Sequence, residues 1–260
     1  MTSRSAHICT VLALAGGLSI TTAGPAVATA DVGPIGAPTV LAAGELRAAL
    51  ALEASLDDGR TNLSPDVWYG LGERLTLGLH HGYRSAGTVG AARGLCLARC
   101  DAAQTRHRGV GLSARFPLVA GDTVVAGELQ TDVAAWSPAA ASVVVGVVAR
   151  WQAGRAWAQA APRLALGLLG RADGNRERAT IDVAVGAPLA RCVGVELGVG
   201  SHGAADAAFF AGMAVPLWTQ LVVDASGRWR VGLAVGTDDL RAGSDLHGFV
   251  AATVEVRVAG

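Results

Sequence analysis

The stretch Leu46-Arg-Ala-Ala-Leu-Ala-Leu-Glu-Ala-Ser-Leu56 has an apolar residue at every second position. Arg47, Glu53 and Ser55 lie between these apolar positions. Successive side chains of a β-strand point to opposite faces, so this alternation predicts a strand with one apolar and one polar face. The stretch also reaches the roughly nine to eleven residues that a tilted strand needs to cross a bilayer.

The same alternation recurs along the chain and predicts further strands. Their approximate bounds are 66–71, 74–80, 110–116, 125–133, 143–152, 157–168, 180–185, 193–199, 209–224, 230–235 and 250–258. In lipid every backbone N–H and C=O needs a partner, and a closed sheet supplies one for each. The expected fold is therefore all-β: a closed antiparallel transmembrane β-barrel of about 12 strands, an even number as in bacterial barrels.

The composition fits this fold and excludes other classes. Hydrophobic residues make up 51% of the chain, yet the chain beyond its N-terminal segment has no run long enough for a helical membrane span. The net charge is zero, and no basic stretch is interleaved with aromatic residues, so nucleic acid is not an expected partner. The 35 glycines suit tight turns and close strand contacts.

The N-terminus predicts export. Arg4 precedes the apolar stretch Ile8 to Ile20, and Ala28-Thr29-Ala30 forms an A-x-A cleavage site. We expect a signal peptide over residues 1–30, a flexible segment over 31–45 and the barrel domain over 46–260.

The connections between the expected strands fall into two groups. Short turns are expected near 72–73, 118–122, 153–155, 188–190 and 225–228. Longer connections are expected at 57–64, 84–107, 170–177, 201–206 and 237–246, with a brief one at 135–141. Barrels of the outer membrane have short periplasmic turns and long outer loops, so this asymmetry predicts an orientation.

Aromatic residues fit that orientation. Tyr69, Phe116, Trp151 and Trp229 are expected to point outward near the short turns, and Tyr83 and Phe209 near the long loops. Such rings favour the boundary between membrane and water.

The chain resembles Gram-negative outer-membrane β-barrel proteins of the porin-like kind over Leu46 to Val258. The most specific part is the hairpin Pro65-Asp-Val-Trp-Tyr-Gly-Leu-Gly-Glu-Arg-Leu-Thr-Leu-Gly-Leu79, whose plan recurs in Trp218 to Val235. The resemblance implies location in the cell outer membrane, contact with its lipid, and small solutes as partners of a pore. The arginine-rich connection 84–108 could also contact lipopolysaccharide phosphates.

The polar face of the expected strands would line the lumen. The candidate lumen-lining residues are Arg47, Glu53, Asp66, Arg74, Arg115, Glu128, Asp132, Arg150, Arg163, Asp182, Glu196, Asp224, Arg230, Glu255 and Arg257. Because acidic and basic members nearly balance, we expect a weakly selective passive pore. An interior closed by Arg–carboxylate pairs, giving a structural wall protein, is the other interpretation. Many further lumen positions are Gly or Ala, which would leave room for a pore.

The cysteines and acidic loops predict little chemistry. Cys96 and Cys100 lie in one connection and could form a disulfide in an exported protein, whereas Cys192 is expected inside a strand. Neither the cysteine spacing nor Asp238, Asp239 and Asp245 predicts a metal site. The segment 170–174 lacks the context of a phosphate-binding loop, so no cofactor is expected.

Two other functions stay open. His80, His81, Ser85 and the pair Ser201-His202 lie near one rim and could belong to a lipid hydrolase, although no spacing among them is diagnostic. A soluble lipocalin-like barrel is the second alternative, but its strands would turn charged residues inward and valines toward water. We therefore expect a protein that is not an enzyme.

Overall fold

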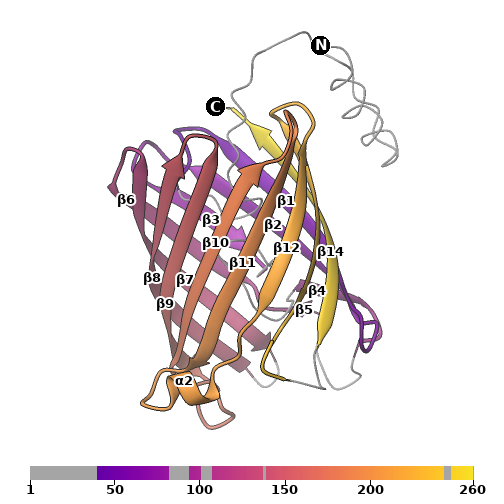
Figure 1. The fold of residues 1–260 in the computed structure, drawn as a ribbon. Coiled ribbons are helices and arrows are strands. Elements are labelled where there is room, and N and C mark those ends of the chain that lie inside the picture. Colours follow the sequence, from indigo (N-terminus) through magenta and orange to yellow (C-terminus); the bar gives the residue numbers. More distant parts are fainter. Residues whose placement is uncertain (1–39, 82–93, 101–106, 137–138, 243–246, 260) are drawn as a thin grey trace.

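The computed structural model describes residues 40–81, 94–100, 107–136, 139–242 and 247–259 (Figure 1). Within these residues the elements are β1 (Leu46–Ser55), β2 (Thr61–Gly70), β3 (Thr76–His80), β4 (Gly94–Ala98), β5 (His107–Arg108), β6 (Gly111–Val119), β7 (Thr123–Trp136), β8 (Ala139–Ala153), β9 (Ala156–Leu169), β10 (Arg178–Pro188), β11 (Val193–Ala204), α2 (Phe209–Gly212), β12 (Leu217–Asp224), β13 (Trp229–Thr237) and β14 (Gly248–Val258). The expected signal peptide lies outside the described residues.

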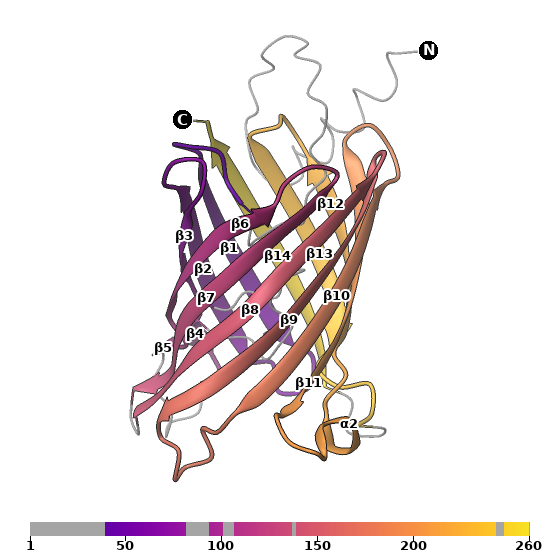
Figure 2. The same cartoon turned by 90° about the vertical axis from the view of Figure 1, so that its left-hand side faces the viewer.

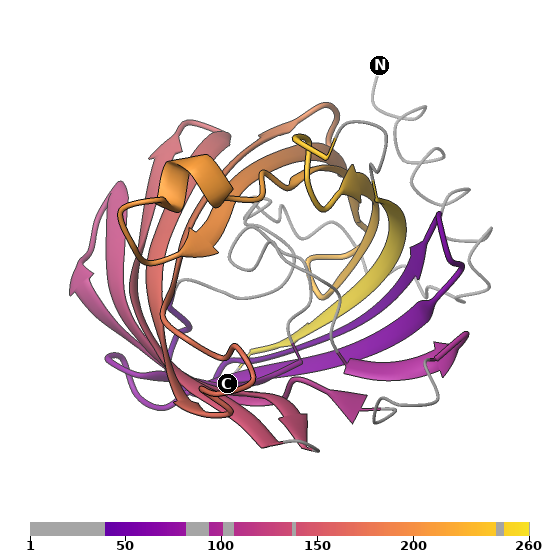
Figure 3. The ribbon, with the colours of Figure 1, turned by 90° about the horizontal axis from the view of Figure 1, so that it is seen from below.

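The described strands form a closed antiparallel barrel. Every strand from β6 to β14 pairs with the next one along the chain, and β1 pairs with β14 on one edge and with β2 on the other. With β2–β3 and β3–β6, twelve of the described strands complete the ring, which Figures 2 and 3 show from the side and from one end. The predicted fold class and strand count are therefore confirmed.

The two faces of the barrel wall differ in chemistry, as the alternation predicts. Along β10, Ile181, Val183 and Val185 are 40–45% exposed, whereas Asp182 and Ala184 between them are buried. Large exposed apolar side chains occur on every ring strand, and the buried inner face holds Arg, Glu, Asp and Gln. A water-soluble protein has the opposite arrangement, so this distribution indicates an apolar medium around the barrel.

The connections follow the predicted asymmetry. At one end, β8 and β9 are joined by residues 154–155 and β12 and β13 by 225–228. At the other end, β9 and β10 are joined by 170–177, and β11 and β12 by 205–216, which include α2. We call these the short-turn end and the long-loop end. β1 starts and β14 finishes at the short-turn end, opposite α2 (Figure 1).

The predicted long connection 84–107 is interrupted by two short strands. β2 pairs with β3 through Val67 to Gly70, and with β4 through Thr61 to Leu63. β4 in turn pairs with β5. Because β3 ends at His80, the long-loop half of β2 needs another partner for its backbone groups, and β4 provides it.

Two local predictions are wrong. Phe209 lies in the short helix α2 rather than in a strand, and β12 begins only after Pro216. Pro216 has no backbone N–H for the ladder, so it limits the strand at this position. Cys192 lies in the turn between β10 and β11, not inside a strand.

Four of the aromatic residues that are expected to point outward do so, whereas Phe209 lies in α2. Tyr69, Phe116, Trp151 and Trp229 are 38–45% exposed and belong to strand ends near the short turns. Tyr83 lies outside the described residues.

No helix among the residues described is long and apolar enough to span a membrane.

Candidate functional site: the charged lumen

Most of the predicted lumen residues lie on the buried inner face of the barrel. Those under 10% exposed are Arg47, Glu53, Asp66, Arg115, Glu128, Arg163, Asp182, Glu196, Arg230 and Glu255. Asp132, Arg150, Asp224 and Arg257 are half-buried. Arg74 is the exception, because it lies exposed in the turn between β2 and β3.

Five of the inner side chains form one connected line, which we call the charge ladder: Arg115, Glu128, Arg163, Asp182 and His202. Arg115 Nε donates to Glu128 Oε1 at 2.7 Å. Arg163 Nε donates to Glu128 Oε2 at 2.5 Å, and its Nη1 donates to Asp182 Oδ2 at 3.0 Å. His202 Nε2 lies 2.7 Å from the other oxygen of Asp182. The ladder runs from β6 to β11 around half of the barrel wall.

Two glycines make the ladder possible. Gly146 on β8 is directly opposite both Glu128 on β7 and Arg163 on β9. A Cβ at position 146 would lie 2.8 Å from Cγ of Arg163, so the Arg163 side chain crosses β8 only because this residue is glycine. Gly200 has the same role farther along, since a Cβ there would lie 2.7 Å from Oδ1 of Asp182 and 2.9 Å from Nε2 of His202.

The alternation of sign in the ladder is a physical requirement. The side chains of Glu128 and Arg115 are 0% and 3% exposed. A buried charge without a partner is costly, and each ladder charge has an opposite charge within hydrogen-bonding distance. The ladder therefore offers a solute in the lumen no uncompensated field of one sign.

A second group of charges lies on the other side of the lumen. Arg257 Nε donates to Glu255 Oε1 at 3.0 Å, and Arg230 Nη1 lies 3.6 Å from the same oxygen. Arg230 Nε also lies 4.0 Å from Asp224 Oδ2. Charges of both signs thus occur on both walls.

Inward aromatic rings cover several of the lumen glycines. A Cβ at Gly186 would lie 2.4 Å from the Trp157 ring, and one at Gly198 would lie 2.4 Å from the Trp218 ring. Gly78 is covered by Trp68 in the same way. All three tryptophans are 2–3% exposed. The expectation that lumen glycines leave room for a pore does not hold at these three positions, because a large ring on the neighbouring strand fills the space at each of them.

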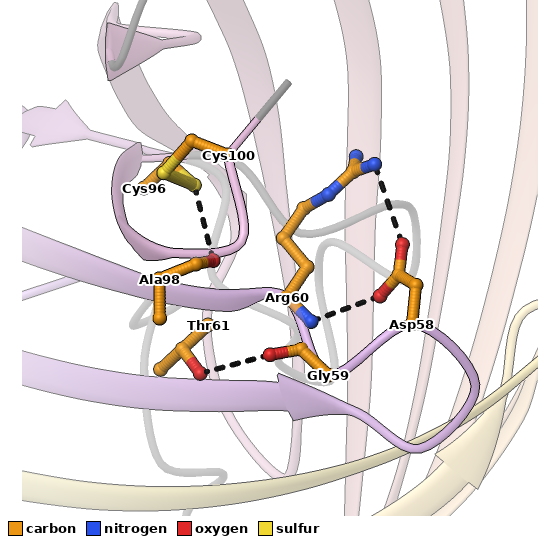
Figure 4. Close-up of a disulfide and its surroundings, with 7 residues drawn as sticks. All are labelled: Asp58, Gly59, Arg60, Thr61, Cys96, Ala98 and Cys100. Carbon is orange, nitrogen blue, oxygen red and sulfur yellow. Dashed lines mark hydrogen bonds and ion pairs between the residues drawn. A yellow bond between two sulfur atoms is a disulfide. The ribbon is translucent and has the colours of Figure 1, made fainter. Parts of the chain in front are cut away.

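A disulfide lies at the long-loop end. Cys96 and Cys100 are bonded, and they enclose Arg99. Arg99 has a φ of 51° and donates from Nη1 to the backbone oxygen of Asp58 at 3.0 Å. Figure 4 shows this disulfide beside the β1–β2 connection, in which Asp58 also bonds Arg60. The disulfide loop is thereby tied to the neighbouring connection.

The rim histidines are engaged in structural contacts. His81 bonds through its backbone N to Asp66 Oδ1 at 2.6 Å and through Nδ1 to the Pro65 oxygen. His202 is the last member of the charge ladder, and Ser85 lies outside the described residues. Within the described part of the chain, no group of three or more His, Cys, Asp or Glu is placed to hold a metal ion.

No protein-family model and no curated protein matches the sequence. Solved structures of outer-membrane channels nevertheless match the fold. The KdgM porin superposes with a TM-score of 0.55 at 6% identity, over 81% of this chain and 98% of the porin. The NanC porin superposes with a TM-score of 0.59 at 9% identity, over 81% of this chain and 100% of the porin. An outer membrane channel from Pseudomonas putida F1 superposes with a TM-score of 0.51 at 8% identity, over 85% of this chain and 97% of the channel. The chain therefore has the fold of a porin-like outer-membrane β-barrel, as its sequence resemblance implies.

Proposed function

We propose that this chain is an outer-membrane channel through which small solutes diffuse passively and with weak charge selection. The observation that carries the proposal is the closed twelve-stranded barrel, whose fold matches solved outer-membrane channels with TM-scores of 0.51–0.59. The charge ladder, in which Arg115, Glu128, Arg163 and Asp182 alternate in sign along the inner wall, supports the weak charge selection. A polar lumen inside an apolar outer surface is the arrangement that a water-filled pathway through lipid requires. Near-equal numbers of both signs give no reason for strong anion or cation preference.

The lumen chemistry favours a narrow pathway. Trp218, Arg230 and Phe249 are large inner side chains, and each is under 3% exposed. Wide porins keep a broad aqueous channel, whereas inward rings leave less space. The proposed solutes are therefore small. One of the similar structures is a KdgM porin in complex with disordered oligogalacturonate, which supports a solute pathway through a barrel of this fold.

The proposed location is the outer membrane, reached by export through the signal peptide expected at 1–30. The apolar belt of the barrel would contact lipid. The long-loop end would face outward, where arginines of the connection between β3 and β6 could meet lipopolysaccharide phosphates.

Fractionation tests the location. The protein should partition with the detergent-extracted outer membrane and migrate faster on a gel when unheated than when boiled. Recovery as a monodisperse protein in water without detergent would contradict the proposal.

Conductance tests the channel. Protein that is folded by the gel criterion should produce discrete current steps in a planar lipid bilayer, and a boiled sample should not. A folded barrel that stays silent would instead support the structural wall protein, whose interior is closed by ion pairs.

A further inference from the structure

The residues just before β1 are folded against the inner face of the barrel. We call Val40–Glu45 the inner segment. Leu41 is 2% exposed and packs in a cluster with Ala49 of β1 and Trp68 of β2. Ala49 and Trp68 are both inner-face residues, so Leu41 lies on the lumen side of the wall near the short-turn end.

Hydrogen bonds hold the inner segment in this place. The backbone N of Leu41 donates to Thr76 Oγ1 on β3 at 2.8 Å, and Thr76 is 1% exposed. The backbone of Gly70 accepts from Gly44 N and donates to Glu45 O, both at 2.9 Å. Glu45 also accepts from Arg47 Nε at 2.8 Å. The segment is thus tied to β1, β2 and β3 at once.

The absence of a side chain at Gly70 leaves the space that the inner segment occupies. A Cβ at position 70 would lie 1.9 Å from the backbone oxygen of Ala42, which is far inside van der Waals contact. No flexible side chain could move aside there, because the neighbour is main chain. Any larger residue at position 70 therefore excludes the inner segment from its position against β2.

The inner segment also changes which side chains border the lumen. Leu41 packs on Ala49 and Trp68 and its backbone N donates to Thr76, so the segment covers the inner faces of these three residues at the short-turn end. Leu41 adds an apolar side chain on the lumen side of Ala49 and Trp68. An apolar covering of this kind reduces both the width and the wetting of the path.

We propose that the inner segment is a built-in stopper that narrows the lumen from the short-turn end. This inference rests on the proposed channel function, because a stopper matters only where solute passes. The Leu41 contact and the Gly70 contacts are two separate anchors, and loss of either should loosen the segment.

Thiol labelling tests the position of the segment without any current measurement. An Ala49→Cys variant is exposed to a charged, water-soluble thiol reagent in detergent, with the unsubstituted protein giving the background of the native cysteines. The introduced thiol should react slowly. It should react several-fold faster when Gly70→Ala is added. Gly212→Ala is the matched control, since a Cβ there meets nothing within 4 Å, and it should leave the slow reaction unchanged.

The heated and unheated gel shift establishes that each variant is folded. If Gly70→Ala does not fold, Leu41→Ser replaces it, because it removes the apolar anchor and leaves the barrel wall intact. Equal labelling of the introduced thiol in folded proteins with and without the change at position 70 or 41 would overturn the stopper.

Conductance then separates the two claims. Gly70→Ala should give larger single-channel current steps than the unsubstituted protein, and Gly212→Ala should not. If labelling responds but no variant conducts, the channel function fails while the segment still covers the lumen wall. If labelling responds and all variants conduct equally, the stopper is wrong and the channel stands.

Discussion

Arg163 on β9 and Glu128 on β7 form an ion pair across an intervening strand, with 2.5 Å between Nε and Oε2. Gly146 on β8 lies directly between them and has no side chain to block the path. The pair links three strands on the inner wall, and it joins Arg115 on one side to Asp182 on the other. Its geometry makes the ladder sensitive to changes at a residue that carries no charge.

The first prediction concerns Gly146. A Gly146→Leu variant should lower the free energy of unfolding by about 3–5 kcal/mol, because it separates the buried Arg163–Glu128 pair and leaves each of these charges with only one of its two ladder partners. Urea unfolding of the refolded barrel, followed by the loss of the fast-migrating gel band, measures this. Gly212→Leu at the long-loop end is the control and should change little. Equal loss in both variants would mean that the ladder adds no stability.

The second prediction concerns charge selection. Glu128→Arg should shift the reversal potential of the channel toward anion preference, because it places a third arginine beside Arg115 and Arg163. Glu177→Arg makes the same change in an exposed connection and should have little effect. The reversal potential of each variant channel, measured in a salt gradient, tests this prediction. An unchanged potential in the Glu128 variant would count against this ladder lining the solute path.

The third prediction concerns the width of the lumen. Trp218→Ala should raise the single-channel conductance, since it removes a ring that covers Gly198 on the inner wall. Removal of a buried Trp should also cost about 3–5 kcal/mol of stability. Trp229→Ala, on the outer face, should leave the conductance as it is. Identical conductance in both variants would show that the inner tryptophans do not border the path.

The fourth prediction concerns pH at the long-loop end. Asp239 Oδ1 accepts from the backbone N of Val215 and of Arg241, both at 2.9 Å, and these bonds lower the pKa of Asp239 below its usual 3.8. A carboxylate with a lowered pKa stabilises the folded state above its ordinary pKa, and this contribution is lost as the pH falls through the lowered value.

Limited proteolysis of the connection 205–216 measures that loss. Cleavage by an acid-active protease should rise as the pH drops below the usual aspartate range. A protease that is active at neutral pH should cleave Asp239→Ala readily and the unsubstituted protein slowly. An acid response of the same size in that variant would assign the effect to other groups.

The fifth prediction concerns the disulfide. The double variant Cys96→Ser, Cys100→Ser should release the loop that places Arg99 against Asp58. The ring encloses few residues, so the loss is local and amounts to at most about 2 kcal/mol. Proteolysis between β4 and β5 should accelerate while the unfolding of the barrel stays the same. A matching loss of barrel stability would contradict this local role.

The sequence could predict the barrel because the information is local. Alternation with a period of two, as in Leu46 to Leu56, sets both the strand and its two faces, and turn residues mark its ends. The predicted strand 209–224 was wrong in its first part, because the alternation of apolar residues continues beyond the end of the real strand. Phe209 and Met213 follow the period of two, but Pro216 separates them from β12.

The organisation of the lumen could not be predicted in the same way. That Gly146 admits Arg163, or that Gly186 receives Trp157, depends on which residues lie opposite each other on neighbouring strands. Strand register depends on the tertiary fold. The sequence alone therefore cannot show whether a neighbouring side chain fills the space beside an inner-face glycine. The placement of Leu41 against Trp68 is likewise a contact that no period reveals.

The reversal potential of the unsubstituted protein in a planar bilayer, under a potassium chloride gradient, tests the central claim most directly. A charge-balanced lumen in a membrane-spanning barrel predicts discrete current steps and a reversal potential close to zero. A silent bilayer with protein shown to be folded, or a potential near the limit for pure anion or cation passage, would contradict the account.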